Sequence, residues 1–310
     1  MKINKTLLFS VVGILFAGSG WASVQSDIQS DADQIGKWFG QQVAHLTAFN
    51  AAANPQLPGD VHSLLGVEVG LSAGVTSSKL DTDAFHSLSL GQLKTSGFDL
   101  PSQVPMGMPL IHAKVGLPFS LDLGLKYGHI NYNNTTNGAK SEVKNSVFGV
   151  EIRRRLIGEG VTGAVLPDVA LSVGYDQSNG NVSRTEHYAT GLGGGETLDA
   201  NTTLKSDWTT GAVTARVVAS KQFLFLTPYI GGGYSRLMGD ANTTMNVVGT
   251  ASSSGLVNVS SKSKSKADDD ILHALGGLQF TFIPTLKLNL GGIYSKNDWG
   301  GTAGLVFSFR

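Results

Sequence analysis

The sequence predicts an all-β protein: a closed, antiparallel, up-and-down transmembrane β-barrel preceded by an amphipathic helix. Three observations favour this fold class. Apolar residues alternate with polar or glycine residues through most of the chain, the links between alternating runs are in turn long and short, and aromatic residues gather at the ends of the apolar faces. Alternation with period two indicates β-strands, because successive side chains leave a pleated chain on opposite faces.

The clearest alternation lies in residues 270–310. Leu272, Leu278 and Phe282 share one face of a first run, and a tight turn at 283–285 leads into a second run at 286–294. A third run extends from Trp299 to Phe309. Each run is close to the ~9–11 residues that a tilted strand needs to cross a bilayer. This segment is therefore predicted to be a transmembrane β-meander.

Similar runs extend back to residue 61, and ten can be distinguished in all. The links at 77–103, 131–139, 178–206 and 239–269 are long and polar, and we expect them to be loops. Outer-membrane barrels have an even number of strands, short periplasmic turns and longer extracellular loops. We expect about 10 strands (range 8–14, because the long links can hide further strands), with both chain ends in the periplasm.

The apolar face carries aromatic residues at both ends of its strands, as the interfaces of a bilayer favour. No Lys or Arg lies on this face near mid-membrane, where it would cost roughly 2–4 kcal/mol. The alternative is a secreted β-sandwich with its apolar rows packed inward. The predicted membrane-interface aromatics are Tyr127, Tyr175, Tyr234, Tyr294 and Trp299 at the outer ends and Phe119, Phe280, Phe282, Phe307 and Phe309 at the inner ends.

The N-terminus has the pattern of a secretory signal peptide, with a short basic region, an apolar stretch at 7–17 and small residues before a cleavage site after Ala22. A membrane-anchoring helix is the alternative, but the apolar stretch is short and ends at Gly18-Ser19-Gly20. The chain has no cysteine, which excludes a lipoprotein anchor, thiol catalysis and disulfides. We divide the chain into signal peptide 1–22, helix and linker 24–58, and barrel 61–310.

Residues 24–50 form the one stretch with helical spacing, with Ile28, Ile35, Val43 and Phe49 on one face. Asn54-Pro55 ends it. The helix is expected to lie on the periplasmic side or to act as a plug in the barrel mouth. A helix with side chains is about 10–12 Å wide, which argues against full entry into a narrow barrel.

The signal peptide, the ten runs and the aromatic-ended last strand together resemble a Gram-negative outer-membrane β-barrel protein. The Gly-Leu-Pro-Phe turn at 116–119 and the Phe-Leu-Thr-Pro-Tyr segment at 225–229 are similar to uncharacterised barrels of this class. The resemblance implies a bacterial outer-membrane location and, as partners, outer-membrane lipid, lipopolysaccharide, periplasmic chaperones and the barrel-assembly machinery. Arg310 after Phe309 departs from the usual terminal Phe. The helix end near Asn54-Pro55 is similar, in few residues, to fatty-acid-channel barrels.

The face opposite the apolar rows gathers charged residues, which would line the lumen. The preferred function is passive, porin-like passage of small solutes, favouring anions because bases outnumber acids. The alternatives are a filled lumen with a structural, adhesive or ligand-binding surface role, and transport of a hydrophobic compound. The candidates are Glu68, His112, Lys114, Asp122, Lys126, Glu151, Arg153, Arg155, Arg216, His273 and Lys287.

Catalytic patterns are weak, and we expect no enzyme. Asp81, Asp83 and His86 resemble part of a barrel-protease site but lack its later Asp-x-His pair, and Glu186-His187 is an isolated pair. The glycines at 191–195 lack the context of a phosphate loop. No metal or cofactor is expected. A net charge of zero gives no electrostatic reason to expect nucleic acid.

Overall fold

The computed structural model describes residues 23–53, 55, 57–62, 64–90, 102–136, 138–158, 166–191, 197–252 and 255–309. The predicted signal peptide, its cleavage site, the glycines at 192–195 and Arg310 lie outside these ranges. The elements in chain order are α1 Ser23–Ala53, β1 Val67–Lys79, α2 Thr82–His86, β2 Gln103–Leu117, β3 Leu121–Thr136, β4 Ala139–Ile157, β5 Asp168–Gly191, β6 Thr197–Ser220, β7 Leu226–Ala251, β8 Gly255–Ala267, β9 Asp270–Ile283, β10 Leu286–Tyr294 and β11 Asp298–Phe309.

The strands form one antiparallel sheet that closes on itself. Apart from β8 and β9, which both pair with β7, each strand pairs with its neighbours in the chain, and β11 returns to pair with β1, so that Phe309 lies opposite Val67. β7 pairs with β8 through residues 239–251 and with β9 through residues 226–236. Residues 268–269 thus interrupt what is geometrically one long strand, and the ring consists of ten strand positions. The predicted closed, up-and-down barrel of about ten strands is confirmed.

The prediction of long polar loops is largely wrong. Residues 178–191 and 197–206 extend β5 and β6, while 239–251 and 255–267 extend β7 and β8. The reason is that the Thr, Ser and Asn residues of these segments complete hydrogen-bonded ladders, and Thr has a high preference for strands. In the tract 261–266, buried or half-buried serines alternate with exposed lysines, which places charge on an edge strand as proteins commonly do.

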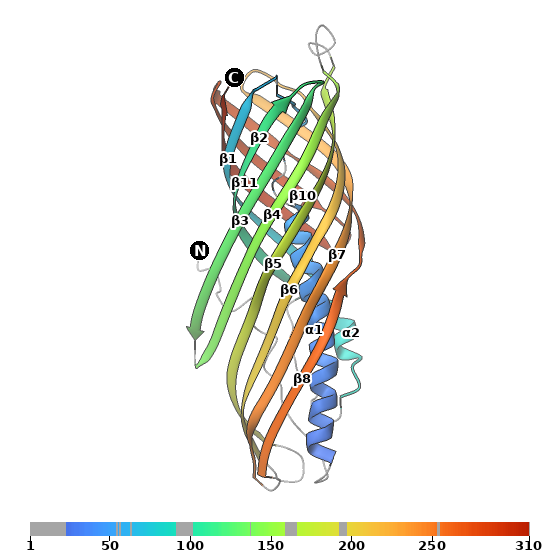
Figure 1. The fold of residues 1–310 in the computed structure, drawn as a ribbon, viewed down its shortest axis with the longest axis vertical. Coiled ribbons are helices and arrows are strands. Elements are labelled where there is room, and N and C mark those ends of the chain that lie inside the picture. Colours follow the sequence, from blue (N-terminus) through green and yellow to red (C-terminus); the bar gives the residue numbers. More distant parts are fainter. Residues whose placement is uncertain are drawn as a thin grey trace.

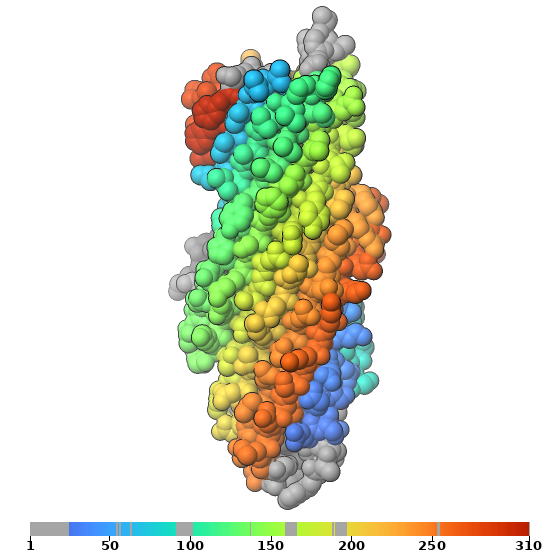
Figure 2. All heavy atoms as spheres, in the orientation of Figure 1, coloured from blue at the N-terminus to red at the C-terminus, as the bar shows by residue number. Residues whose placement is uncertain are grey.

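The barrel is therefore lopsided. β10 and β11 meet near Tyr294 and Trp299, whereas the β5–β6 and β7–β8 hairpins continue far beyond that level as a curved sheet (Figure 1). The first half of α1 packs on this extension beside β8, and both appear together in the lower part of Figure 2. Ile28 and Ile35 are fully buried there against Leu198 and Val259. Burial of such side chains is worth roughly 1.5–3 kcal/mol each, which holds the helix in place.

The second half of α1 enters the barrel. Ala44, Ala48 and Phe49 are buried against β6, β7 and β9 residues, and polar Thr47 and Asn50 bond to Thr210 and Thr76 of the wall at 2.9 and 2.8 Å. The predicted helix is confirmed. Its second half lies in the position expected for a plug.

Small residues explain why a helix fits in a barrel of this size. Gly36, Gly40, Ala44 and Ala48 recur every four residues and form a narrow stripe on one face of α1. At Gly40 an added Cβ would lie 2.7 Å from Ser265 Oγ on β8, so the backbone approaches the sheet closely. The width expected for a helix with ordinary side chains does not apply to this face.

The apolar face of the strands points outward, as expected for a barrel in lipid. Of the predicted interface aromatics, Phe119, Phe282 and Tyr294 are 86, 63 and 65 % exposed, and all the others are exposed or half-exposed. None of the helices described is both long and apolar enough to cross a membrane.

Candidate functional site: the filled lumen

The predicted lumen residues all point to the inside of the barrel. Glu68, His112 and Asp122 are at most 4 % exposed, and Lys114, Arg153 and His273 are also buried. The side chains of Lys126, Glu151, Arg155, Arg216 and Lys287 are between 10 and 24 % exposed. Burial of so many charges is tolerable only if they are paired, because an isolated buried ion is strongly unfavourable.

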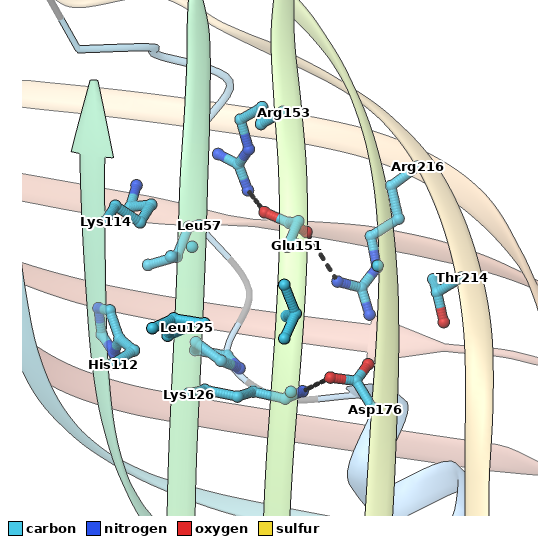
Figure 3. Close-up of a pocket in the computed structure, with 15 residues that line it drawn as sticks. Leu57, His112, Lys114, Leu125, Lys126, Glu151, Arg153, Asp176, Thr214 and Arg216 are labelled. Atoms are coloured by element: carbon cyan, nitrogen blue, oxygen red, sulfur yellow. Dashed lines mark hydrogen bonds and ion pairs between the residues drawn. The ribbon is translucent and has the colours of Figure 1, made fainter. Parts of the chain in front are cut away.

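One group of pairs lies beyond the C-terminal end of α1 (Figure 3). Glu151 on β4 accepts from Arg153 at 3.0 Å and lies 3.7 Å from Arg216 on β6. Lys126 on β3 pairs with Asp176 on β5 at 2.9 Å. These side chains and the linker residues Pro55 and Leu57 surround a polar cavity of about 50 Å³. A water molecule needs about 10–15 Å³ measured in this way, so the cavity has room for a few waters.

A second group of pairs lies nearer the short turns. Glu68 on β1 is 2.9 Å from Lys114 on β2 and 3.4 Å from Lys287 on β10, while His62 of the linker bridges Glu68 and Asp122 at 3.3 and 3.1 Å. His62 thus joins the linker to two strands of the wall, β1 and β3. His62 was not predicted to lie in the lumen.

Three acids missing from the predicted set pair with its bases. Asp60 lies 3.6 Å from Lys287, Asp168 lies 3.8 Å from Arg155, and Asp176 neutralises Lys126. With these three, the interior described here carries equal numbers of acids and bases. The expected preference for anions therefore loses its basis. Asp176 could have been found from the sequence, because it is next to the outward-facing Tyr175 on an alternating strand.

Cations of the wall also bind the chain that fills the lumen. Lys126 Nζ donates to the carbonyl oxygen of Ala51 at 2.5 Å, and Arg216 donates to that of Ala52. Arg153 and Arg155 donate to the carbonyl oxygens of Pro58 and Val61. The last carbonyls of a helix have no partner within it and carry partial negative charge. Because α1 has no basic residue in its last turn, the barrel supplies the cations that cap it.

At the other rim, His45 fastens α1 to the barrel. Its ring nitrogens lie 2.8 Å from Asp269 and 2.9 Å from Asp298. Asp298 precedes Trp299, and Asp269 lies beyond the level of Tyr234, so this contact is outside the outer ring of aromatic residues. Burial would lower the pKa of His45, but the bonds to both carboxylates outweigh it and raise the pKa to about 9. His45 is therefore a cation at neutral pH.

Other residues singled out in the sequence take part in helix capping or ion pairs. Asp81 caps α2 by accepting from the Ala84 amide at 2.9 Å, and its carbonyl accepts from Trp38 of α1. Glu186 pairs with Arg184, and His187 with Asp199, each at 2.8 Å on the extended β5–β6 hairpin. The ring nitrogens of His112 have no hydrogen-bond partner among the described residues. The described part of the chain holds no group of side chains suited to a metal ion.

The two ends of the described chain lie at opposite ends of the molecule. Phe309 is paired next to the short turns, whereas Gln25, near the start of α1, donates to the Asn258 carbonyl near the tip of the β7–β8 hairpin at 3.3 Å. These two ends are far apart because α1 enters the barrel with its second half. The side of the membrane that each end faces stays a prediction.

A closed antiparallel barrel with an outward apolar face and a polar, charged interior defines the class of outer-membrane β-barrel proteins. The chain belongs to the family DUF6588, described as a family of unknown function, whose model matches residues 75–308. No curated protein matches it.

Solved structures similar to the chain are also outer-membrane barrels. The outer membrane protease OmpT from Escherichia coli is 11 % identical with a TM-score of 0.40, covering 81 % of this chain and 100 % of its own. The translocator domain of autotransporter NalP from Neisseria meningitidis is 10 % identical with a TM-score of 0.34, covering 93 % of this chain and 99 % of its own. A Pseudomonas aeruginosa FadL homologue is 8 % identical with a TM-score of 0.30, covering 88 % of this chain and 97 % of its own.

Proposed function

We propose that this protein is a non-enzymatic outer-membrane barrel, closed in its resting state, that acts at the cell surface. The barrel is the anchor, and the extended sheet with the first half of α1 is the part exposed to the outside. The observation that supports this most is the occupied lumen. Lys126, Arg153 and Arg216 of the wall bond to carbonyl groups of the helix and linker, and the cavity beside them measures about 50 Å³.

In this proposal lipid and lipopolysaccharide surround the outward face. The exposed Tyr and Trp residues at the outer ends of the strands and the exposed Phe residues at the inner ends support it, because amphipathic rings favour membrane interfaces. The long hairpins then face the outside, and the short turns face the periplasm.

Planar-bilayer recording tests the closed lumen. The refolded full-length protein should give no regular single-channel steps in dilute or concentrated potassium chloride. A variant without residues 23–62 serves as the positive control and should conduct, because it lacks both helix and linker. Regular steps from the full-length protein, of the same size as those of the truncated variant, would contradict the proposal.

Passage of small solutes is the second candidate. It is favoured by the polar, charge-paired wall that would remain if the helix and linker moved aside. In that case a helix held in place should block transport. Uptake of a small sugar by cells with α1 cross-linked to β8, compared with the same cells after reduction, distinguishes the two candidates.

A further inference from the structure

A second pocket lies outside the barrel lumen, between α1 and the extended sheet. It is lined by one face of the helix, by Leu80 after β1, and by strands β2, β4, β5 and β6. Its wall includes Phe39, Val43, Leu46, Met106, Val143 and Trp208. None of its described lining residues is charged, in contrast to the lumen cavity.

The few polar groups in this wall already have partners. Trp208 Nε1 donates to Ser178 Oγ at 3.1 Å, and Thr47 Oγ1 donates to the Val43 carbonyl at 2.8 Å. Gln42 Oε1 accepts from the Asp81 amide at 3.1 Å. The pocket therefore offers mainly apolar contact to a ligand.

We infer that this pocket binds an uncharged molecule with a single aliphatic chain. The size of the pocket favours a chain over a ring. Its volume is about 70 Å³, whereas an apolar cavity that holds benzene is about 150 Å³. A narrow, flexible chain can occupy such a space and leave its remainder in solvent.

The position of the pocket indicates a ligand from outside the bilayer. Trp208 pairs with Gly180, five residues along β5 beyond the aromatic Tyr175. Five residues of a strand span roughly 17 Å along the strand, or about 13 Å along the axis of a barrel with the usual strand tilt, so the pocket lies above the level where lipid chains end. The inference rests on the proposed function in one respect: the proposed function assigns the pocket to the outer side of the membrane.

Photolabelling of the protein in lipid nanodiscs tests the inference, since detergent chains would compete for the pocket. The probe is dodecanol carrying a diazirine in its chain, and labelled peptides are identified by mass spectrometry. We expect labelling of the peptides with Met106 and Trp208, competed by decane and not by the bulky cage adamantane. Label confined to outward-facing peptides, or equal competition by adamantane, would overturn the inference.

A second arm identifies the source of the chain. A phosphatidylcholine with the same diazirine in an acyl chain should label outward-facing strand residues only. If it labels the pocket as strongly as the alkanol does, the occupant is a membrane lipid, and the inference of a free molecule is wrong.

Two matched variants give the specificity control. Val143→Phe fills the pocket and should weaken labelling there about tenfold, the change expected for loss of about two buried methylene groups. Val248→Phe is the same change at a side chain that is 52 % exposed on β7. The pocket of this variant should be labelled as strongly as that of the native protein. If Val143→Phe fails to fold by circular dichroism, Val43→Phe fills the pocket from the helix side. Labelling at the native level in a folded variant whose pocket is filled would contradict the inference. Bilayer recording on the same samples tests the closed lumen separately.

Discussion

Lys126 Nζ lies 2.5 Å from the carbonyl oxygen of Ala51 and 2.9 Å from Oδ1 of Asp176. One wall cation therefore caps the helix in the lumen and also neutralises a buried carboxylate. Because both partners depend on it, the position of α1 and the electrostatics of the barrel wall are linked.

Replacement of Lys126 by Met should destabilise the protein by about 3 kcal/mol, because it leaves the Asp176 carboxylate buried without its nearest cation. Urea unfolding of the lipid-reconstituted protein, followed by tryptophan fluorescence, measures this. In the double variant Lys126→Met with Asp176→Leu the loss should be smaller than in the single variant, since no unpaired charge remains. A double variant that is less stable than the single one would contradict this pairing.

Replacement of Gly40 by Leu should displace α1 from β8. A Cβ at this position would lie 2.7 Å from Ser265 Oγ and 2.8 Å from Thr243 Oγ1, and a leucine side chain has no space there. Limited trypsin digestion at Lys37, which is exposed on the helix, measures the release as faster cleavage. Gln41→Leu, at the exposed neighbouring position, is the matched control and should be cleaved at the native rate. Equal rates for both variants would mean that the small-residue stripe does not hold the helix against the sheet.

The contact of His45 with Asp269 and Asp298 should make stability dependent on pH. Burial would lower the pKa of His45, but the two carboxylates raise it from 6.5 to about 9. A raised folded-state pKa means that the stabilisation is complete below about pH 6.5 and is lost as the pH rises through about 9. We expect the native protein to lose roughly 2–3 kcal/mol across this range through His45. Unfolding free energies at both ends of the range, for the native protein and His45→Gln, give the difference. The two proteins should lose stability unequally, and parallel losses would exclude this histidine as the cause.

Much of the fold follows from the sequence because side-chain direction in a strand is tied to residue number. Glu68 and Arg153 lie inside and Tyr294 lies outside, as alternation predicts. The ends of the strands are less predictable. In residues 239–267, Thr, Ser and Asn form a hairpin that packs against α1, and polar composition alone does not distinguish such strands from loops.

The filled lumen is harder to predict, because it depends on contacts between distant segments. Nothing in the local sequence near Asp60 or His62 shows that they meet Lys287 and Glu68. The spacing of Gly36, Gly40, Ala44 and Ala48 is a readable signal for close helix packing, although it does not identify the surface that the helix packs on.

Disulfide cross-linking tests the position of α1 most directly, since the native chain has no cysteine. An added Cβ at Gly36 would lie 3.1 Å from Ser263 Oγ on β8. Gly36→Cys with Ser263→Cys should therefore form an intramolecular disulfide on mild oxidation of the membrane-embedded protein. The pair Gly36→Cys with Lys262→Cys, whose lysine lies on the opposite, exposed face of β8, should not. No cross-link in the first pair, or equal cross-linking in both, would contradict a helix seated against the sheet that leads into the barrel.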